Sequence, residues 1–183
     1  MLQAAAHVLV TEGYERTTTA RVALRAGVSV GSVYQYFPNK EAMVAALIER
    51  HAEEIVTITE QAVRQSKGRN LDEALRAIIK AGIDAHRVSP PLHKILVEQV
   101  PRVGRIAEAM DTSRRLSELI EQVLRERKDE LAPGCQPSLA ALVLETALEA
   151  VAHKIVIQRP ELLEDEVIER EMFALASGYL RPR

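Results

Sequence analysis

The side chains best suited to recognise another molecule lie close together in the segment 17–40, TTTARVALRAGVSVGSVYQYFPNK. The amide of Gln35 can form two hydrogen bonds with an adenine, and Val30 can contact the methyl group of a thymine. Lys40 lies where a further helix is predicted to begin, so its charge and the helix dipole would together favour a phosphate. These groups indicate a surface that binds a DNA duplex.

The same segment is predicted to form two short helices joined by a tight turn. Threonines 17–19 and Ser29 are candidate N-caps, because a hydroxyl can accept a hydrogen bond from an unpaired backbone N–H. Gly27 follows the first helix, where glycine adopts a left-handed backbone at low cost. A helix as short as 30–36 cannot stabilise itself. Neighbouring helices must hold it, largely through Val33, as they hold the recognition helix of a helix-turn-helix.

The run GYERTTTARVALRAGVSVGSVYQYFPNKEAM resembles the DNA-binding signature of the TetR (tetracycline-repressor) family of regulators. The threonine run, the A-x-x-A-G-V-S turn, the aromatic pair Tyr34 and Tyr36, and the F-x-x-K that ends at Lys40 all match. The last two predicted helices resemble the family more loosely. The resemblance implies an all-α fold, with an N-terminal three-helix helix-turn-helix DNA-binding domain at 1–45. A helical effector-binding and dimerisation domain would follow at 46–183.

The resemblance also implies which residues contact DNA. Thr19, Tyr34, Tyr36 and Lys40 would bind the phosphate backbone, although each tyrosine could instead be partly a core aromatic. Family members can carry an arginine where this chain has Ala20, so readout from the first helix of the motif should be weaker. The expected DNA-contacting residues are Thr18, Thr19, Arg21, Ser29, Val30, Gly31, Ser32, Tyr34, Gln35, Tyr36 and Lys40.

Composition places the chain among globular proteins. It has 183 residues, of which 47% are hydrophobic and 27% charged, which is ordinary for a folded domain. The net charge of -2 argues against coating nucleic acid by charge alone, but not against local recognition of one site. No apolar run approaches the roughly 20 residues that span a bilayer, so no membrane contact is expected. The single Cys135 suits a reducing cytoplasm.

The two helices predicted near 138–158 and 164–180 are too apolar for the surface of a monomer. One face can pack inward, and a second face needs a partner. Two copies of such a helix pair would form a four-helix interface with two-fold symmetry. The alternative is a compact monomer in which both faces are internal. The expected homodimer interface comprises Leu144, Leu148, Val151, Ile155, Met172, Leu175 and Tyr179.

The middle helices have the pattern of a ligand chamber, with mostly aliphatic walls and few polar anchors. An aromatic content of 3% makes an aliphatic or mixed effector more expected than a flat aromatic one. No pair of histidines or cysteines has the spacing of a convincing metal site, and no cofactor is expected. The candidate ligand-binding residues, each of which could equally be a surface or core residue, are His86, His93, Gln99, Arg102 and Met110.

These patterns predict a DNA-binding transcriptional regulator, and repression is the usual mode of the family it resembles. It would bind a palindromic operator on double-stranded DNA as a homodimer and be released by a small-molecule effector. A regulator controlled by a protein partner, or one without an effector, is the alternative. The sequence has no phosphate-binding glycine-rich loop and no H-E-x-x-H motif. No catalytic residue is therefore assigned, and an enzyme is disfavoured.

Overall fold

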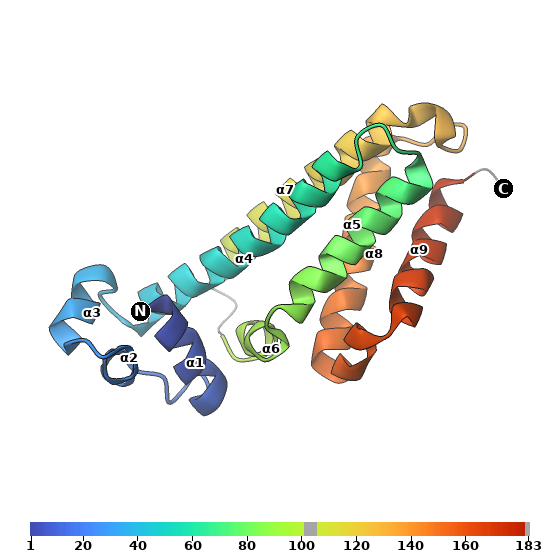
Figure 1. The fold of residues 1–183 in the computed structure, drawn as a ribbon. Helices are drawn as coiled ribbons and strands as arrows, with labels where there is room; N and C mark the ends of the chain where they lie inside the picture. Colours follow the sequence, from blue (N-terminus) through green and yellow to red (C-terminus); the bar gives the residue numbers. More distant parts are fainter. Residues whose placement is uncertain (101–105, 182–183) are drawn as a thin grey trace. The chain divides into compact units, whose positions relative to one another are not determined.

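The computed structural model describes residues 1–100 and 106–181, and these residues are all-α, as the sequence predicts (Figure 1). None of their helices is long and apolar enough to cross a membrane. The helices are α1 (Leu2–Glu12), α2 (Thr19–Ala26), α3 (Val30–Tyr36), α4 (Lys40–Gln65), α5 (Leu71–Arg87), α6 (Pro90–Glu98), α7 (Ile106–Glu126), α8 (Pro137–Gln158) and α9 (Glu166–Leu180), with short 3-10 segments at Lys128–Glu130 and Pro160–Glu164.

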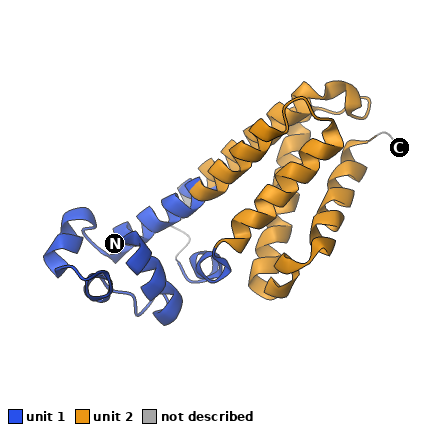
Figure 2. Ribbon diagram, viewed as in Figure 1, with its two compact units in different colours: residues 1–53, 89–109 blue, residues 54–88, 110–183 orange. Residues whose placement is uncertain are grey.

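The chain forms two compact units, which divide it differently from the predicted domains (Figure 2). Unit 1 comprises 1–53 and 89–109, and unit 2 comprises 54–88 and 110–183. Helix α4 therefore contributes residues to both units, and α6 belongs to the unit that contains the helix-turn-helix. The boundary between 45 and 46 stays a prediction about function, while the packing places α6 with the N-terminal helices.

The packing of α6 within unit 1 explains this division. Leu92 and Leu96 of α6 are buried in one cluster with Leu9 of α1 and Leu47 of α4. Gln99, at the end of α6, accepts a hydrogen bond on its Oε1 from the backbone N–H of Tyr14 at 3.0 Å. Burial of this apolar surface and a hydrogen bond between distant parts of the chain therefore fasten α6 to α1.

The local signals of the helix-turn-helix are confirmed residue by residue. Thr18 is the N-cap of α2, and its hydroxyl accepts a hydrogen bond from the N–H of Arg21 at 3.2 Å. Ser29 caps α3 in the same way, through the N–H of Ser32 at 3.0 Å. Gly27 has a φ of 67°, the left-handed backbone that ends α2. Because the unpaired backbone groups at these helix ends bond with residues close by, the turn between the two helices is specified by its own sequence.

In unit 2, one buried arginine joins the end of α7 to the turn that follows α4 through three backbone carbonyls. The guanidinium of Arg127 donates hydrogen bonds to the carbonyl oxygens of Ser66 at 2.6 Å, Arg69 at 3.0 Å and Val123 at 3.0 Å. Arg127 is only 6% exposed. Ser66 follows the end of α4, and Val123 lies in the last turn of α7, so the positive charge also faces the negative ends of two helix dipoles.

Replacing Arg127 with alanine should destabilise the protein by roughly 3 kcal/mol. The substitution strands buried carbonyls, and hydrogen bonds that involve a charged group contribute about 1.5–3 kcal/mol each, with incomplete additivity. Arg125→Ala is the matched control, because that side chain is largely exposed and pairs only with Glu121 across one helical turn. Urea unfolding should show less than about 0.5 kcal/mol for the control. Equal effects of the two substitutions would contradict the role given to Arg127.

Candidate DNA-binding surface and effector pocket

One face of α3 is buried and the other is open to solvent. Val33 is completely buried in unit 1, whereas Val30, Gly31 and Gln35 are exposed. Ser32 is half-buried. The residues expected to face base edges therefore lie on the accessible side of a helix held by its opposite side.

Tyr34 and Tyr36 are both exposed, so neither is a core aromatic. Thr19 is buried, and its hydroxyl donates a hydrogen bond to the phenolic oxygen of Tyr34 at 3.2 Å. Thr19 is thereby placed to orient a neighbouring side chain that would meet DNA. Direct phosphate contact by Thr19 stays a prediction. It would require the hydroxyl to turn away from Tyr34, or to donate to Tyr34 and a phosphate at once.

The two cations assigned to phosphate contacts already have partners within unit 1. The ammonium of Lys40 donates to the carbonyl oxygen of Tyr14 at 3.3 Å and lies 4.1 Å from the centroid of that tyrosine ring. Arg21 forms an ion pair with Glu12. The sequence missed the residue that caps α4, which is Asn39: its Oδ1 accepts a hydrogen bond from the N–H of Ala42 at 2.7 Å. A phosphate here would therefore compete with existing contacts of Lys40 and Arg21.

The pentapeptide GVSVG at 27–31 matches the G-x-S-x-G spacing of a hydrolase nucleophile. In that motif the serine lies in a sharp turn between a strand and a helix. Ser29 instead lies between two helices, and the described residues contain no strand. Its oxygen accepts a hydrogen bond from the N–H of Ser32 and lies 2.8 Å from the hydroxyl of that residue. Ser29 therefore has the surroundings of a helix cap.

Unit 2 contains a cavity of about 60 Å³ that is partly open to solvent. Its walls come from the unit 2 part of α4 and from α5, α7, α8 and α9, and they are mainly aliphatic. Polar groups enter mostly from α5 and α8. The lining residues are Thr59, Ile78, Ile79, Gly82, His86, Leu116, Ile120, Glu145, Leu148, Glu149, Ala152 and Met172.

Of the five predicted ligand-binding residues, only His86 lines this cavity. His93 and Gln99 belong to unit 1, where His93 Nδ1 lies 2.8 Å from Nε2 of His51 and Gln99 holds the backbone of Tyr14. Met110 is 69% exposed. Arg102 lies outside the described residues. The segment breaks that suggested these positions mark helix ends, whereas the cavity is formed by the middle of helices.

The sequence missed the polar wall of the cavity, Glu145 and Glu149 of α8. With His153 they are spaced four residues apart and form a polar stripe on an otherwise apolar helix. That spacing was visible in the sequence. What it could not show is that Glu145 is only 5% exposed.

Burial dominates the electrostatics of Glu145 and raises the pKa of its carboxyl. The hydrogen bond from the hydroxyl of Ser113 opposes this shift in pKa, while the charge of Glu149 adds to it. Thr146 donates to Glu145 Oε2 at 3.4 Å. Two hydroxyls and the charge of His153 favour the ionised form of the carboxyl, but burial outweighs them, so the low dielectric favours its neutral form.

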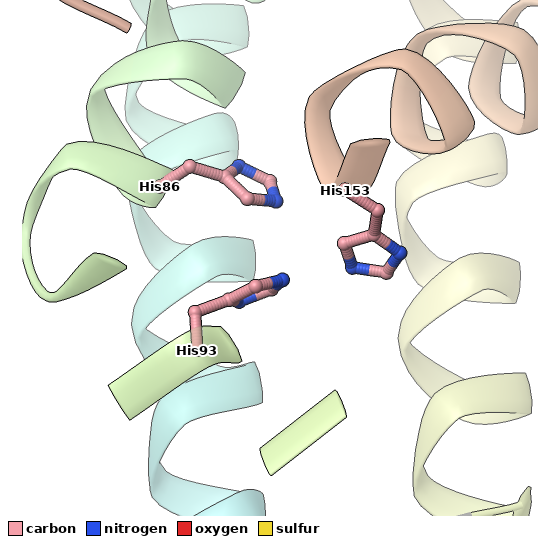
Figure 3. A group of neighbouring side chains, drawn as sticks. All are labelled: His86, His93 and His153. Atoms are coloured by element: carbon pink, nitrogen blue, oxygen red, sulfur yellow. The ribbon is translucent and has the colours of Figure 1, made fainter. Parts of the chain in front are cut away.

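Two histidines accompany these carboxyls in unit 2. His153 Nε2 lies 3.0 Å from Glu149 Oε1. Figure 3 shows His153 of α8 beside His86 of α5, with ring centroids 5.7 Å apart in an edge-to-face arrangement; the third side chain drawn, His93, belongs to unit 1. Nδ1 of His86 lies 2.7 Å from the carbonyl oxygen of Gly82, so the neutral ring carries its proton on that nitrogen.

The structure corrects part of the expected dimer interface. Leu144, Ile155 and Met172 are buried in the core of unit 2, so they have little surface left for a partner. Leu148 and Val151 are half-buried. The exposed apolar surface of α8 and α9 comprises the predicted Leu175 and Tyr179 together with Leu139, Leu142, Val143 and Val167, which the sequence did not single out.

Comparison with known proteins identifies the family. The model of the bacterial regulatory proteins of the tetR family matches residues 1–47. A second model, the tetracyclin repressor-like C-terminal domain, matches residues 70–180. The chain belongs to the TetR family. It is therefore a transcriptional regulator with a DNA-binding N-terminal region, and the resemblance seen in the helix-turn-helix motif extends to the C-terminal helices.

Individual relatives match the chain at low sequence identity or over part of its length. The nucleoid occlusion factor SlmA of Glaesserella parasuis is 35% identical over 85 residues, which are 46% of this chain and 41% of that protein. The chain thus spans less than half of the length of that relative. FadR from Bacillus subtilis in complex with stearoyl-CoA has a TM-score of 0.77 at 18% identity, over 98% of this chain and 97% of that one. The SmeT–triclosan complex has a TM-score of 0.72 at 24% identity, over 96% and 88%. These structures share the fold.

The buried carboxyl predicts a pH dependence of stability. Because the pKa of Glu145 is raised in the folded protein, the folded state holds this proton more strongly than the unfolded state does. Its contribution to stability is therefore present at low pH and is lost as pH rises above about 4.5, the ordinary value for glutamate. Glu145→Gln removes the titration and keeps the shape of the side chain.

The melting temperature of Glu145→Gln relative to the original chain should accordingly rise between pH 5 and pH 8. Glu118→Gln is the control, since Glu118 lies exposed on α7 and pairs with Arg114 at 2.7 Å. Its melting temperature should keep a nearly constant offset from that of the original chain. Calorimetry of the three proteins at a series of pH values measures both offsets. An offset for Glu145→Gln that does not change with pH would show that burial does not govern this carboxyl.

Proposed function

We propose that this TetR-family regulator is a cytoplasmic repressor that binds a palindromic operator as a homodimer and is released by a small molecule. The observation that carries the DNA-binding part is the exposed face of α3. Gln35 and Val30 lie on that face, and Val33 anchors the opposite face in the core of unit 1. A helix presented in this way can enter the major groove, where the edges of all four base pairs differ.

The homodimer is supported by the exposed apolar surface of α8 and α9. Leu139, Leu142 and Val143 follow the i, i+3, i+4 spacing of one helix face, and Leu175 and Tyr179 follow the i, i+4 spacing. An apolar surface of this kind favours association with another copy of itself. Two identical reading helices related by a two-fold axis would require two related half-sites in the DNA.

The small-molecule effector is supported by the cavity in unit 2. Its aliphatic walls suit a ligand that is apolar over most of its length. FadR of Bacillus subtilis in complex with stearoyl-CoA and the SmeT–triclosan complex have similar folds, and each contains a small molecule. Release from DNA requires that the ligand prefer one of two conformations of the dimer. Helix α4 supplies the covalent connection, because it contributes residues to both units.

A second candidate is a DNA-binding regulator that is controlled by a protein partner or has no effector, and the similarity to a nucleoid occlusion factor, SlmA, keeps it in view. The two functions differ in one measurable property. A ligand that binds the native state raises its stability and, if it is an effector, changes operator affinity by the same factor by which DNA changes ligand affinity. A protein of the second kind would bind its operator with an affinity that no ligand of the cavity alters.

Selection from random duplexes should return a palindrome, and Gln35→Ala should relax the preference for one base pair in each half-site. Loss of a two-bond contact with adenine corresponds to about 1–3 kcal/mol of discrimination at that position. Gln61→Ala is the matched control, because Gln61 is an exposed glutamine in the unit 2 part of α4. It should leave both affinity and preference unchanged. A uniform loss of affinity for Gln35→Ala, with the same preferred sequence, would remove Gln35 from base recognition.

Charged substitutions on the exposed apolar surface of α8 and α9 should separate the dimer. Leu142→Glu or Leu175→Glu places a carboxylate where apolar surface would be buried, so light scattering should report monomers at micromolar concentration and operator affinity should fall at least tenfold. Val88→Glu is the control, because Val88 is an equally exposed apolar residue outside these helices. That variant should stay dimeric. A monomeric original chain would refute the proposed interface.

A further inference from the structure

The cavity of unit 2 has walls of two different kinds. Ile78 and Ile79 of α5, Leu116 and Ile120 of α7 and Met172 of α9 form an aliphatic surface. The wall formed by α8 carries the apolar Leu148 and Ala152 and, in addition, two carboxyls, Glu145 and Glu149, on successive turns. A molecule that filled this space would therefore meet apolar side chains over most of its surface and negative charge at one side.

The carboxyls on the α8 wall have polar partners within the protein, and the charge of His153 lowers the pKa of Glu145 against the effect of burial. The hydroxyls of Ser113 and Thr146 donate hydrogen bonds to Glu145. The imidazole of His153 pairs with Glu149. His86 is the other titratable group that lines the cavity. The lining, as far as the described residues define it, includes no lysine and no arginine. The formal charge of the lining is thus negative whenever the two carboxyls are ionised and the imidazoles are neutral.

The ionised form of Glu145 is held at a cost in free energy, because desolvation by burial is the largest influence on its pKa and raises it. A positively charged group that entered beside Glu145 would supply an opposite charge in a low dielectric, where the attraction is far stronger than in water. An anionic group in the same place would add repulsion to desolvation. The burial that raises the pKa of Glu145 is the same property that would make it select for a cation.

We propose that the effector cavity takes an amphipathic organic cation, with its ammonium group between Glu145 and Glu149 and its aliphatic part against Ile78, Leu116 and Met172. This inference rests on the proposed function as a ligand-responsive repressor and gives the chemical class of the effector. The aliphatic contacts supply affinity without discrimination, and the two carboxyls supply the selection by charge.

Three probes with the same eight-carbon chain separate charge from apolar burial: octyltrimethylammonium, 1-octanol and octanoate. Isothermal titration of the full chain at pH 7.5 should give the tightest binding for the ammonium, weaker binding for the alcohol and the weakest for the carboxylate. The ammonium should be favoured over octanoate by at least tenfold, which corresponds to about 1.4 kcal/mol. Equal or tighter binding of octanoate would overturn the proposal, as would the absence of binding by the ammonium.

Variants assign the preference to the carboxyls. Glu145→Gln should weaken the affinity for the ammonium by about tenfold or more, because the ammonium loses a charged partner. It should change the affinity for 1-octanol by less than about twofold. Glu118→Gln, the exposed control on α7, should change neither affinity. Parallel losses for ammonium and alcohol in Glu145→Gln would mean that the residue shapes the cavity without selecting charge, and would overturn the proposal.

Operator binding in the presence of each probe distinguishes this inference from the proposed function. If 1-octanol binds and weakens operator affinity while the ammonium is not preferred, the protein is ligand-responsive and the inference about charge is wrong. If the ammonium binds preferentially through Glu145 and operator affinity is unchanged, the cation site stands and release by this ligand is wrong. Preferential binding together with weakened operator affinity supports both.

Discussion

An all-helical chain must satisfy the backbone groups that each helix leaves unpaired at its ends, and this protein meets that constraint with side chains placed close by in sequence. Thr18, Ser29, Asn39, Asn70 and Asp165 accept hydrogen bonds from N–H groups in the first turns of α2, α3, α4, α5 and α9. At the opposite ends, Gly27 closes α2 through a left-handed backbone, while Arg127 donates hydrogen bonds to one carbonyl of α7 and to two in the turn that follows α4. Because these caps are local, residues close by in sequence specify where these five helices begin.

The DNA-reading surface follows from the same constraint. Helix α3 has seven residues and is too short to persist alone, so its cap at Ser29 and the buried Val33 must hold it. Once the helix is held, the exposed side chains of Gln35 and Val30 have a fixed backbone beneath them. Little conformational entropy of the backbone is then lost on binding, which leaves more of the contact energy for discrimination between bases.

Residues with local causes were predictable, and those whose roles depend on tertiary packing were not. The caps, the turn at Gly27 and the bounds of α2 and α3 agree with the sequence because a few neighbouring residues determine them. Helix α8 is apolar on more than one face, so its sequence pattern does not show which face packs into the core. The structure turns Leu144 and Ile155 inward and leaves Leu139 and Leu142 exposed. The same uncertainty led the prediction of effector residues toward helix ends, and among the described ones His86 lines the cavity of unit 2.

Glu145 shows what tertiary context adds to a visible pattern. Its spacing with Glu149 and His153 would ordinarily describe a solvated stripe on a helix, with i, i+4 pairs of small energetic value. Packing of α8 against its neighbours converts the first of these residues into a buried carboxyl beside a cavity. A well-packed apolar side chain there would make the free protein more stable, since burial of the carboxyl opposes its ionised form more than its partners favour it. The unfavourable free energy of burying this carboxyl thus lies at the α8 wall of the cavity, where a bound cation could offset it.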